Sequence, residues 1–164
     1  MYLPWRHNKV ANVVYQTIHP KAKDGVRQPI REVYTDDDVE LWWDTKVKTL
    51  AKLEHNKPDI VIWKKSQLKC FILDICVCLD VNVDKNIKLK LDSNLPLAAE
   101  LKRLYPTYDF DVLPIVIGAT GLVTEKLFEV FKTLEVKDID GTILKCQKCA
   151  LTGTMKIVKS LMKM

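Results

Sequence analysis

The chain has 164 residues, of which 48% are hydrophobic and 29% are charged. This length and composition predict one globular domain over residues 1–164 with a core of its own, and they argue against a separate second domain. The formal net charge of +5 is common on ordinary proteins, so by itself it favours a nucleic-acid partner only weakly.

The longest apolar runs, over residues 70–79 and 112–119, are too short to cross a bilayer, so no membrane segment is expected. The first residues lack the apolar core and the cleavage site of a signal peptide. The chain has five cysteines, and an odd number fits a reducing compartment better than a disulfide framework. An intracellular protein is therefore expected.

Apolar spacing predicts the elements of the first half of the chain. Val10, Val13 and Val14 recur at helical spacing, which predicts a helix over residues 5–18 that ends before Pro20. A polar loop over 21–28 then leads to two mostly alternating segments, 29–34 and 39–50, which are typical of strands around an acidic turn. Two further strand-like runs, 60–63 and 70–77, are joined by a short polar turn and predict a hairpin.

The second half of the chain alternates between helical and strand-like patterns. Residues 83–105 have a helical pattern, but Pro96 inside it predicts either two shorter helices or one kinked helix. Residues 110–118 are typical of a buried strand, and residues 123–134 and 142–163 of helices. The crossover before residue 110 is long enough for parallel pairing with the preceding strand. The predicted fold class is α/β (α+β), with a mixed sheet flanked by helices.

Two acidic residues mark the predicted hairpin. Asp74 lies in the middle of an apolar run, where a buried carboxylate costs several kcal/mol unless a metal or hydrogen bonds compensate it. Asp59 follows Pro58 and opens the preceding strand, a dipeptide that also suits a simple turn. A hairpin would bring both carboxylates to one end of the sheet, and paired carboxylates suit Mg²⁺.

Seven sequence blocks then follow one another in an order known from one family. The blocks are Arg6 to Ala11, Trp43-Asp44, Lys57 to Val61, Leu73 to Ile75, Leu97 to Tyr105, Pro114 to Gly121 and Leu151 to Thr154. Together they resemble the restriction-like endonuclease domain, of PD-(D/E)XK type, at the C-terminus of non-LTR retrotransposon polyproteins. The resemblance runs through nearly the whole chain.

The resemblance implies a restriction-endonuclease-like fold, with an αβββαβ core and additional C-terminal helices. It also implies a Mg²⁺-dependent or Mn²⁺-dependent endonuclease that nicks double-stranded DNA by phosphodiester hydrolysis and so supplies a 3′-OH primer for reverse transcription. The chain would then be a fragment of a larger polyprotein in the nucleus. Its partners would be DNA and the rest of the polyprotein with its RNA, and a homodimer with a second copy stays open.

The same resemblance implies the roles of individual residues. Asp59, Asp74 and Lys90 would be catalytic. Both acids and the backbone carbonyl of Ile75 would hold the metal ion. The DNA contacts would come from Arg6, His7, Lys85 and Lys88, and His7 has the alternative role of completing the metal shell.

Two positions depart from the family pattern. Cys76 stands where the family shorthand has a lysine, two residues after the second acid, and it cannot supply a fixed positive charge. Lys90 best matches a lysine recruited from the following helix, with Lys88 and Lys85 as alternates. Asn94 stands where some members carry a tyrosine. These departures keep two other functions open: a domain of the same fold that binds DNA without cutting it, and a non-catalytic interaction module.

The C-terminal segment carries two further motifs. Cys146 and Cys149 lack a second cysteine pair at finger spacing, so a zinc site is not expected and two packing positions on a helix are the simpler interpretation. Five lysines between residues 145 and 163 are consistent with either a solvated helix face or a set of phosphate contacts.

Overall fold

The computed structural model describes residues 3–23 and 26–164, so two residues of the loop expected over 21–28 lie outside the described part. Contacts divide the chain into two compact units. Unit 1 comprises residues 1–28, 75–87 and 115–164, and unit 2 comprises residues 29–74 and 88–114. Two strands and one helix run through both units, so the chain passes between them several times.

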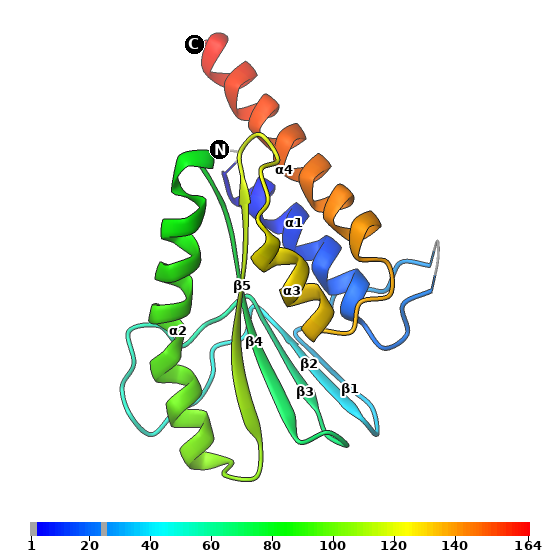
Figure 1. Ribbon diagram of the computed structural model, residues 1–164, viewed down its shortest axis with the longest axis vertical. Helices are drawn as coiled ribbons and strands as arrows, with labels where there is room; N and C mark the ends of the chain where they lie inside the picture. The colour runs from blue at the N-terminus through cyan, green and yellow to red at the C-terminus, as the bar shows by residue number, and fades with distance from the viewer. Residues whose placement is uncertain (1–2, 24–25) are drawn as a thin grey trace. The chain divides into compact units, whose positions relative to one another are not determined.

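A single five-stranded sheet follows the order β1-β2-β3-β4-β5 (Figure 1). The strands are β1 (Val33–Thr35), β2 (Val39–Trp43), β3 (Ile60–Lys64), β4 (Lys69–Cys78) and β5 (Asp109–Gly118). The first four pair antiparallel. Strand β5 runs parallel to β4, because the backbone bonds from Asp109 to Leu68 and from Ala119 to Cys78 keep the same sequence offset. The prediction of a mixed sheet flanked by helices is confirmed.

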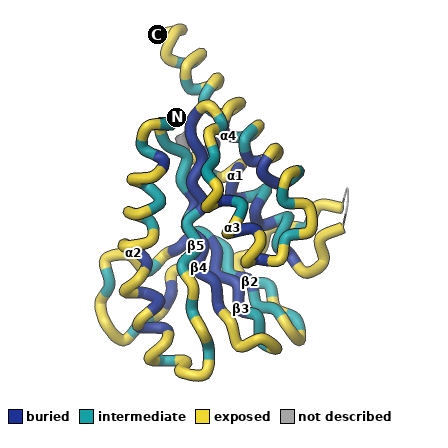
Figure 2. The backbone as a smooth tube through the Cα atoms, viewed as in Figure 1, coloured by how far each residue is buried: buried dark blue, intermediate teal, exposed yellow. Residues whose placement is uncertain are grey.

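Helix α2 (Val83–Leu104) covers one face of the sheet in unit 2. Its residues Leu97, Ala98 and Leu101 pack on alternate side chains of β3 and β4, which Figure 2 shows as largely buried strands. The sheet side chains of this cluster are Val61, Trp63, Cys70 and Ile72. Burial of this apolar surface, at about 25 cal/mol per Å², anchors the C-terminal half of α2.

Pro96 does not divide α2, so the predicted alternative of two separate helices is wrong. The reason lies in which side of the helix carries the proline. Pro96 is exposed, whereas Asn94 and Leu97 are buried. The backbone carbonyl that loses its partner at a proline therefore lies on the side where water can replace the bond.

The predicted strands over 29–34 and 39–50 are too long in both cases. Strand β2 ends at Trp43 because Asp44 adopts a φ of 48°, in the left-handed region that turns the chain away from the sheet. The loop that follows is tied to α2 by Glu100, whose carboxylate accepts the backbone N–H groups of Leu50 and Ala51 at 3.1 and 3.2 Å. Buried Val47 joins the core cluster.

Neutralising Glu100 is expected to remove a pH-dependent part of the stability. Its hydrogen bond with Arg103 and the Ala51 N–H lower the pKa of this carboxyl from 4.5 to about 2. Because the folded-state pKa is depressed, this stabilisation is present above pH 4.5 and is lost as the pH falls towards 2. Glu100→Gln should therefore lower the Tm at pH 6 and flatten its fall with acid. Equal Tm values for the variant and the wild type at pH 6 would contradict this account.

Unit 1 is built around two helices that lie side by side in Figure 1, α1 (Leu3–Ile18) and α4 (Ile139–Met162). It also contains the short η1 (Asp80–Asn82) and α3 (Glu125–Thr133). The guanidinium of Arg6 donates to the Thr154 hydroxyl at 2.9 Å and to the Val77 carbonyl at 3.1 Å. This arginine is only 9% exposed, so it ties α1 to α4 and β4 inside the unit.

Adding a methyl group at Gly153 is expected to separate α1 from α4. A Cβ there would lie 2.5 Å from Cγ and 2.7 Å from Cβ of Arg6, too close for the stem of a buried side chain to avoid. Gly153→Ala should cost about 1–3 kcal/mol of the free energy of unfolding, measured by urea denaturation. The exposed neighbour Thr152 supplies the control, since Thr152→Ala should change stability far less. A Gly153→Ala protein as stable as Thr152→Ala would overturn the packing argument.

The predicted helices all form, with ends that differ by a few residues. The last helix begins at Ile139 rather than Thr142, because the Asp138 side chain accepts the Gly141 N–H at 3.0 Å and caps it. Within residues 3–23 and 26–164, no helix is long and apolar enough to span a bilayer.

Candidate active site

Asp59 and Asp74 face each other across two neighbouring strands. The antiparallel register pairs Ile60 of β3 with Leu73 of β4. Continued by one residue, this register sets Asp59 directly opposite Asp74, and opposite residues of an antiparallel pair present their side chains on the same face. That face is also the one that carries Ile72, so both acids point towards α2.

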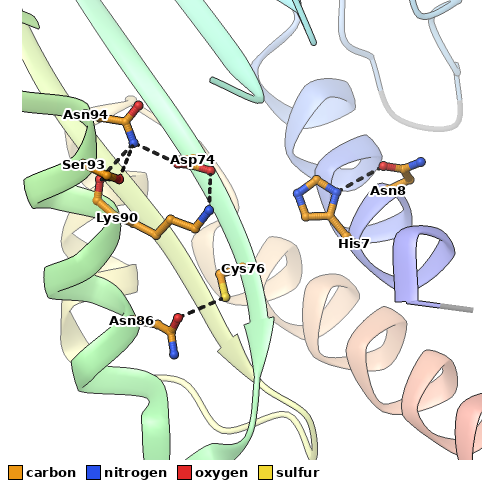
Figure 3. A network of polar contacts seen from close by, with 8 residues as sticks. All are labelled: His7, Asn8, Asp74, Cys76, Asn86, Lys90, Ser93 and Asn94. Atoms are coloured by element: carbon orange, nitrogen blue, oxygen red, sulfur yellow. Dashed lines mark hydrogen bonds and ion pairs between the residues drawn. The ribbon is translucent and has the colours of Figure 1, made fainter. Parts of the chain in front are cut away.

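Helix α2 brings two polar side chains, Lys90 and Asn94, next to Asp74 on this face (Figure 3). Lys90 and Asn94 precede Leu97 and Leu101 at spacings of four, three and four residues, which places all of them on the sheet-facing side of the helix. The Lys90 ammonium lies 3.0 Å from Oδ1 of Asp74. The Asn94 amide donates to Oδ2 of Asp74 at 2.8 Å and to the Lys90 carbonyl at 2.9 Å.

The Asp74 carboxylate is therefore held at both oxygens and is largely shielded from water. Its side chain is 15% exposed, against 31% for Lys90, and Asn94 is 2% exposed. Burial raises the pKa of Asp74, because it disfavours the ionised form. The charge of Lys90 and the Asn94 hydrogen bond act against this rise, and a hydrogen bond with the Asp59 carboxyl adds to it.

The influence of Asp59 shows that the two carboxyl groups lie within hydrogen-bonding reach. The backbone of Asp59 is fixed from the other side, where its carbonyl accepts the Asp44 N–H at 2.8 Å. The side chain of Asp44 also pairs with Lys57 at 3.2 Å. Pro58, which lies between Lys57 and Asp59 in the sequence, is buried.

The structure separates Lys90 from the two alternate lysines. Lys88 and Lys85 are both exposed, whereas Lys90 is half-buried with its ammonium 3.0 Å from Asp74. Lys88 lies two residues before Lys90, a spacing that puts it on the opposite side of a helix. Lys90 is thus the lysine of α2 that contacts Asp74.

The predicted DNA contacts Arg6 and His7 belong to unit 1, whereas Asp74 belongs to unit 2. Arg6 is buried by the contacts described above. His7 is partly exposed, and its Nδ1 lies 3.1 Å from Oδ1 of Asn8 (Figure 3). Their role in binding DNA stays a prediction, as does that of Lys85 and Lys88.

The two positions that depart from the family pattern differ in what they do. Cys76 lies in unit 1, where its Sγ is 3.7 Å from Oδ1 of Asn86. Asn94 is a site residue that the sequence interpretation missed, since it was noted only as the absence of a tyrosine. Its spacing of four residues from Lys90 on a helical pattern was the signal that could have found it.

Ile75, the third expected metal ligand, is the residue after Asp74 in β4 and is buried, so its carbonyl stays a predicted ligand. Over the described residues, no group of three or more histidine, cysteine or acidic side chains gathers at one place, so Asp59 and Asp74 stand as a pair of acids. All five cysteines are thiols outside any disulfide. Burial raises the pKa of Cys146 to about 12, so it is a neutral packing residue of α4.

No protein-family model matches this chain, and no curated protein matches it.

Proposed function

We propose that the chain is a metal-dependent DNA endonuclease domain with a restriction-endonuclease-like fold. The observation that carries the proposal is that Asp59 and Asp74 lie opposite each other on one face of the sheet, with the Lys90 ammonium 3.0 Å from Asp74. A pair of facing carboxylates beside an ammonium is the set of groups that phosphodiester hydrolysis needs. The resemblance to retrotransposon endonucleases supports the same reaction and the role of nicking a DNA target for reverse transcription.

The donor set fits a divalent cation. Asp59 and Asp74 offer hard carboxylate oxygens from adjacent strands. Burial and, to a smaller extent, the Asp59 carboxyl raise the pKa of Asp74, and a bound cation would oppose this rise. Asp59, Asp74 and the Ile75 carbonyl would hold Mg²⁺ or Mn²⁺. When bound, the ion supplies charge neutralisation at the scissile phosphate and at the departing 3′ oxygen.

The protein's own groups would do the remaining work. Lys90 reaches the carboxylates from a rigid helix, so its amine can orient a water molecule or hold a proton at Nζ. Asn94 fixes the Asp74 carboxylate plane through Oδ2, which leaves Oδ1 towards the ammonium. The buried position of Asp74 lowers the local dielectric and strengthens each of these interactions.

A second candidate is a domain of the same fold that binds DNA without cutting it. The observation in its favour is that both oxygens of Asp74 already accept bonds, from Lys90 and from Asn94. A cation would have to displace the Lys90 ammonium from Oδ1. In this alternative the three side chains are a buried polar network that stabilises the contact between α2 and the sheet.

Plasmid nicking separates the two candidates. Purified protein with Mg²⁺ or Mn²⁺ should convert supercoiled plasmid to the open circle, and Asp59→Ala and Asp74→Ala should each abolish this activity. Asp111→Ala is the matched control, because Asp111 is an exposed carboxylate of β5 in the same unit. It should cut like the wild type.

Equal cutting by the wild type and both site variants would indicate a contaminating nuclease and defeat the proposal. No cutting by any of them, with DNA binding that weakens as salt rises, would support the second candidate.

A further inference from the structure

Helix α4 has a second apolar face that nothing in the structure covers. The side facing α1 buries Ile143, Cys146, Ala150 and Gly153. A different set of large apolar side chains, spaced by seven, four, three and four residues, is between 44% and 81% exposed: Leu144, Leu151, Met155, Val158 and Met162. We name these five residues the α4 stripe.

The spacing of the α4 stripe is that of a coiled-coil seam. Steps of three and four residues keep side chains in one line along a helix, and they provide the knobs that a partner helix receives. The stripe lies on nearly the opposite side of α4 from the buried face, because Leu144 and Met155 are each two residues from a buried position, a step of about 200° around a helix. The pattern continues through Lys148, which occupies the position between Leu144 and Leu151.

The charges beside the α4 stripe all have one sign. Lys145, Lys148, Lys156, Lys159 and Lys163 are exposed, and residues 141–164 contain no aspartate or glutamate. Helical spacing places Lys148 within the line of the stripe and the other four lysines along one flank of it. Lys156 also lies 3.9 Å from the Trp5 ring of α1, so part of this flank is held in place.

This charge distribution disfavours a second copy of the chain as the occupant. Two parallel α4 helices would juxtapose Lys148 with its equivalent in the seam, and two antiparallel helices would juxtapose the flanking lysines. Like charges at such positions are repulsive. A helix whose flanking positions are acidic meets neither penalty and gains pairs with Lys145 and Lys159.

We propose that the α4 stripe is a docking surface for an acidic amphipathic helix of a partner protein. The partner presents leucine-like side chains at spacings of three and four residues to the stripe. Its glutamates or aspartates flank that seam and face the lysines of α4. This surface is independent of Asp59 and Asp74, which belong to unit 2.

A designed peptide tests the proposal on the full chain. The probe is a labelled helical peptide with leucines at this spacing and flanking glutamates, and its charge-reversed twin carries lysines instead. Fluorescence anisotropy should show the acidic peptide binding at least about tenfold more tightly than the basic one. Met155→Glu should weaken binding by at least about tenfold, whereas Val81→Glu, at an exposed apolar site outside α4, should not.

A charge swap makes the test reciprocal. The double variant Lys145→Glu, Lys159→Glu should prefer the basic peptide, which a merely sticky surface would not do. If Met155→Glu alters the circular dichroism spectrum, Val158→Ser takes its place. Equal binding of the two peptides would overturn the proposal. The proposal would also be overturned if Met155→Glu left peptide binding unchanged and instead abolished self-association of the chain, binding to DNA or binding to anionic vesicles.

Discussion

Replacing Asp74 by Asn is expected to abolish DNA cleavage and, at neutral pH, to make the protein more stable. The loss of cleavage should reach about 10³-fold or more, because the neutral amide brings no negative charge to a bound cation and forms no ion pair with the Lys90 ammonium. The gain in stability should be about 0.5–2 kcal/mol, because a buried carboxylate with a raised pKa costs free energy when it ionises. Nicking assays and urea denaturation of the same preparations measure both effects.

The pH dependence of this gain has a definite sign. The folded-state pKa of Asp74 lies above the unfolded value of 3.8, so the folded protein binds the proton more tightly than the unfolded chain. The contribution of Asp74 to stability therefore falls as the pH rises through the window between the two values. Asp74→Asn lacks this fall, and its advantage over the wild type should grow with pH. A variant less stable than the wild type at pH 7 would show that the contacts with Lys90 and Asn94 outweigh burial.

Replacing Lys90 by Ala is expected to reduce cleavage by about 10²–10⁴-fold while DNA affinity stays nearly unchanged. Lys90 is the lysine that reaches Asp74, whereas Lys85 and Lys88 are exposed. Loss of the ammonium should also raise the pKa of Asp74 further, since its charge acts to lower that pKa. Nicking rates and the pH profile of cleavage should change together.

Lys88→Ala is the matched control for this prediction, because it removes the same charge from the same helix two residues away. It should leave the nicking rate unchanged. Lys90→Arg keeps the positive charge with a group that does not release its proton, so it separates orientation of water from proton transfer. A Lys90→Ala protein that cuts at the wild-type rate would return the catalytic role to Lys85 or Lys88.

Much of the fold was predictable because its periodic segments are long. The apolar run around Asp74 and the helical pattern over residues 83–105 each extend over several residues, and the structure confirms a hairpin and a helix there. The loop after Trp43 was not predictable in the same way. It depends on the left-handed backbone of Asp44 and on Glu100, which is distant in sequence.

Part of the candidate site could likewise be predicted from the sequence, and part could not. Asp59 and Asp74 could be paired from the sequence, because a short turn fixes the register of a hairpin. The choice among three lysines and the position of Asn94 could not, because they require the rotation of α2 about its axis. That rotation is set by Leu97, Ala98 and Leu101 in the core cluster.

The sheet-facing side of α2 couples the packing of the core to the position of the Lys90 amine. One continuous helix carries both the residues that pack in the core, Leu97 and Leu101, and the Lys90 amine about two turns before Leu97. A smaller side chain at Leu97 or Leu101 would tilt α2 on the sheet. The displacement would be larger at Nζ of Lys90, because this atom lies farther along the helix. Substitutions in the core cluster should therefore misplace the Lys90 amine, and so reduce cleavage, before they unfold the protein.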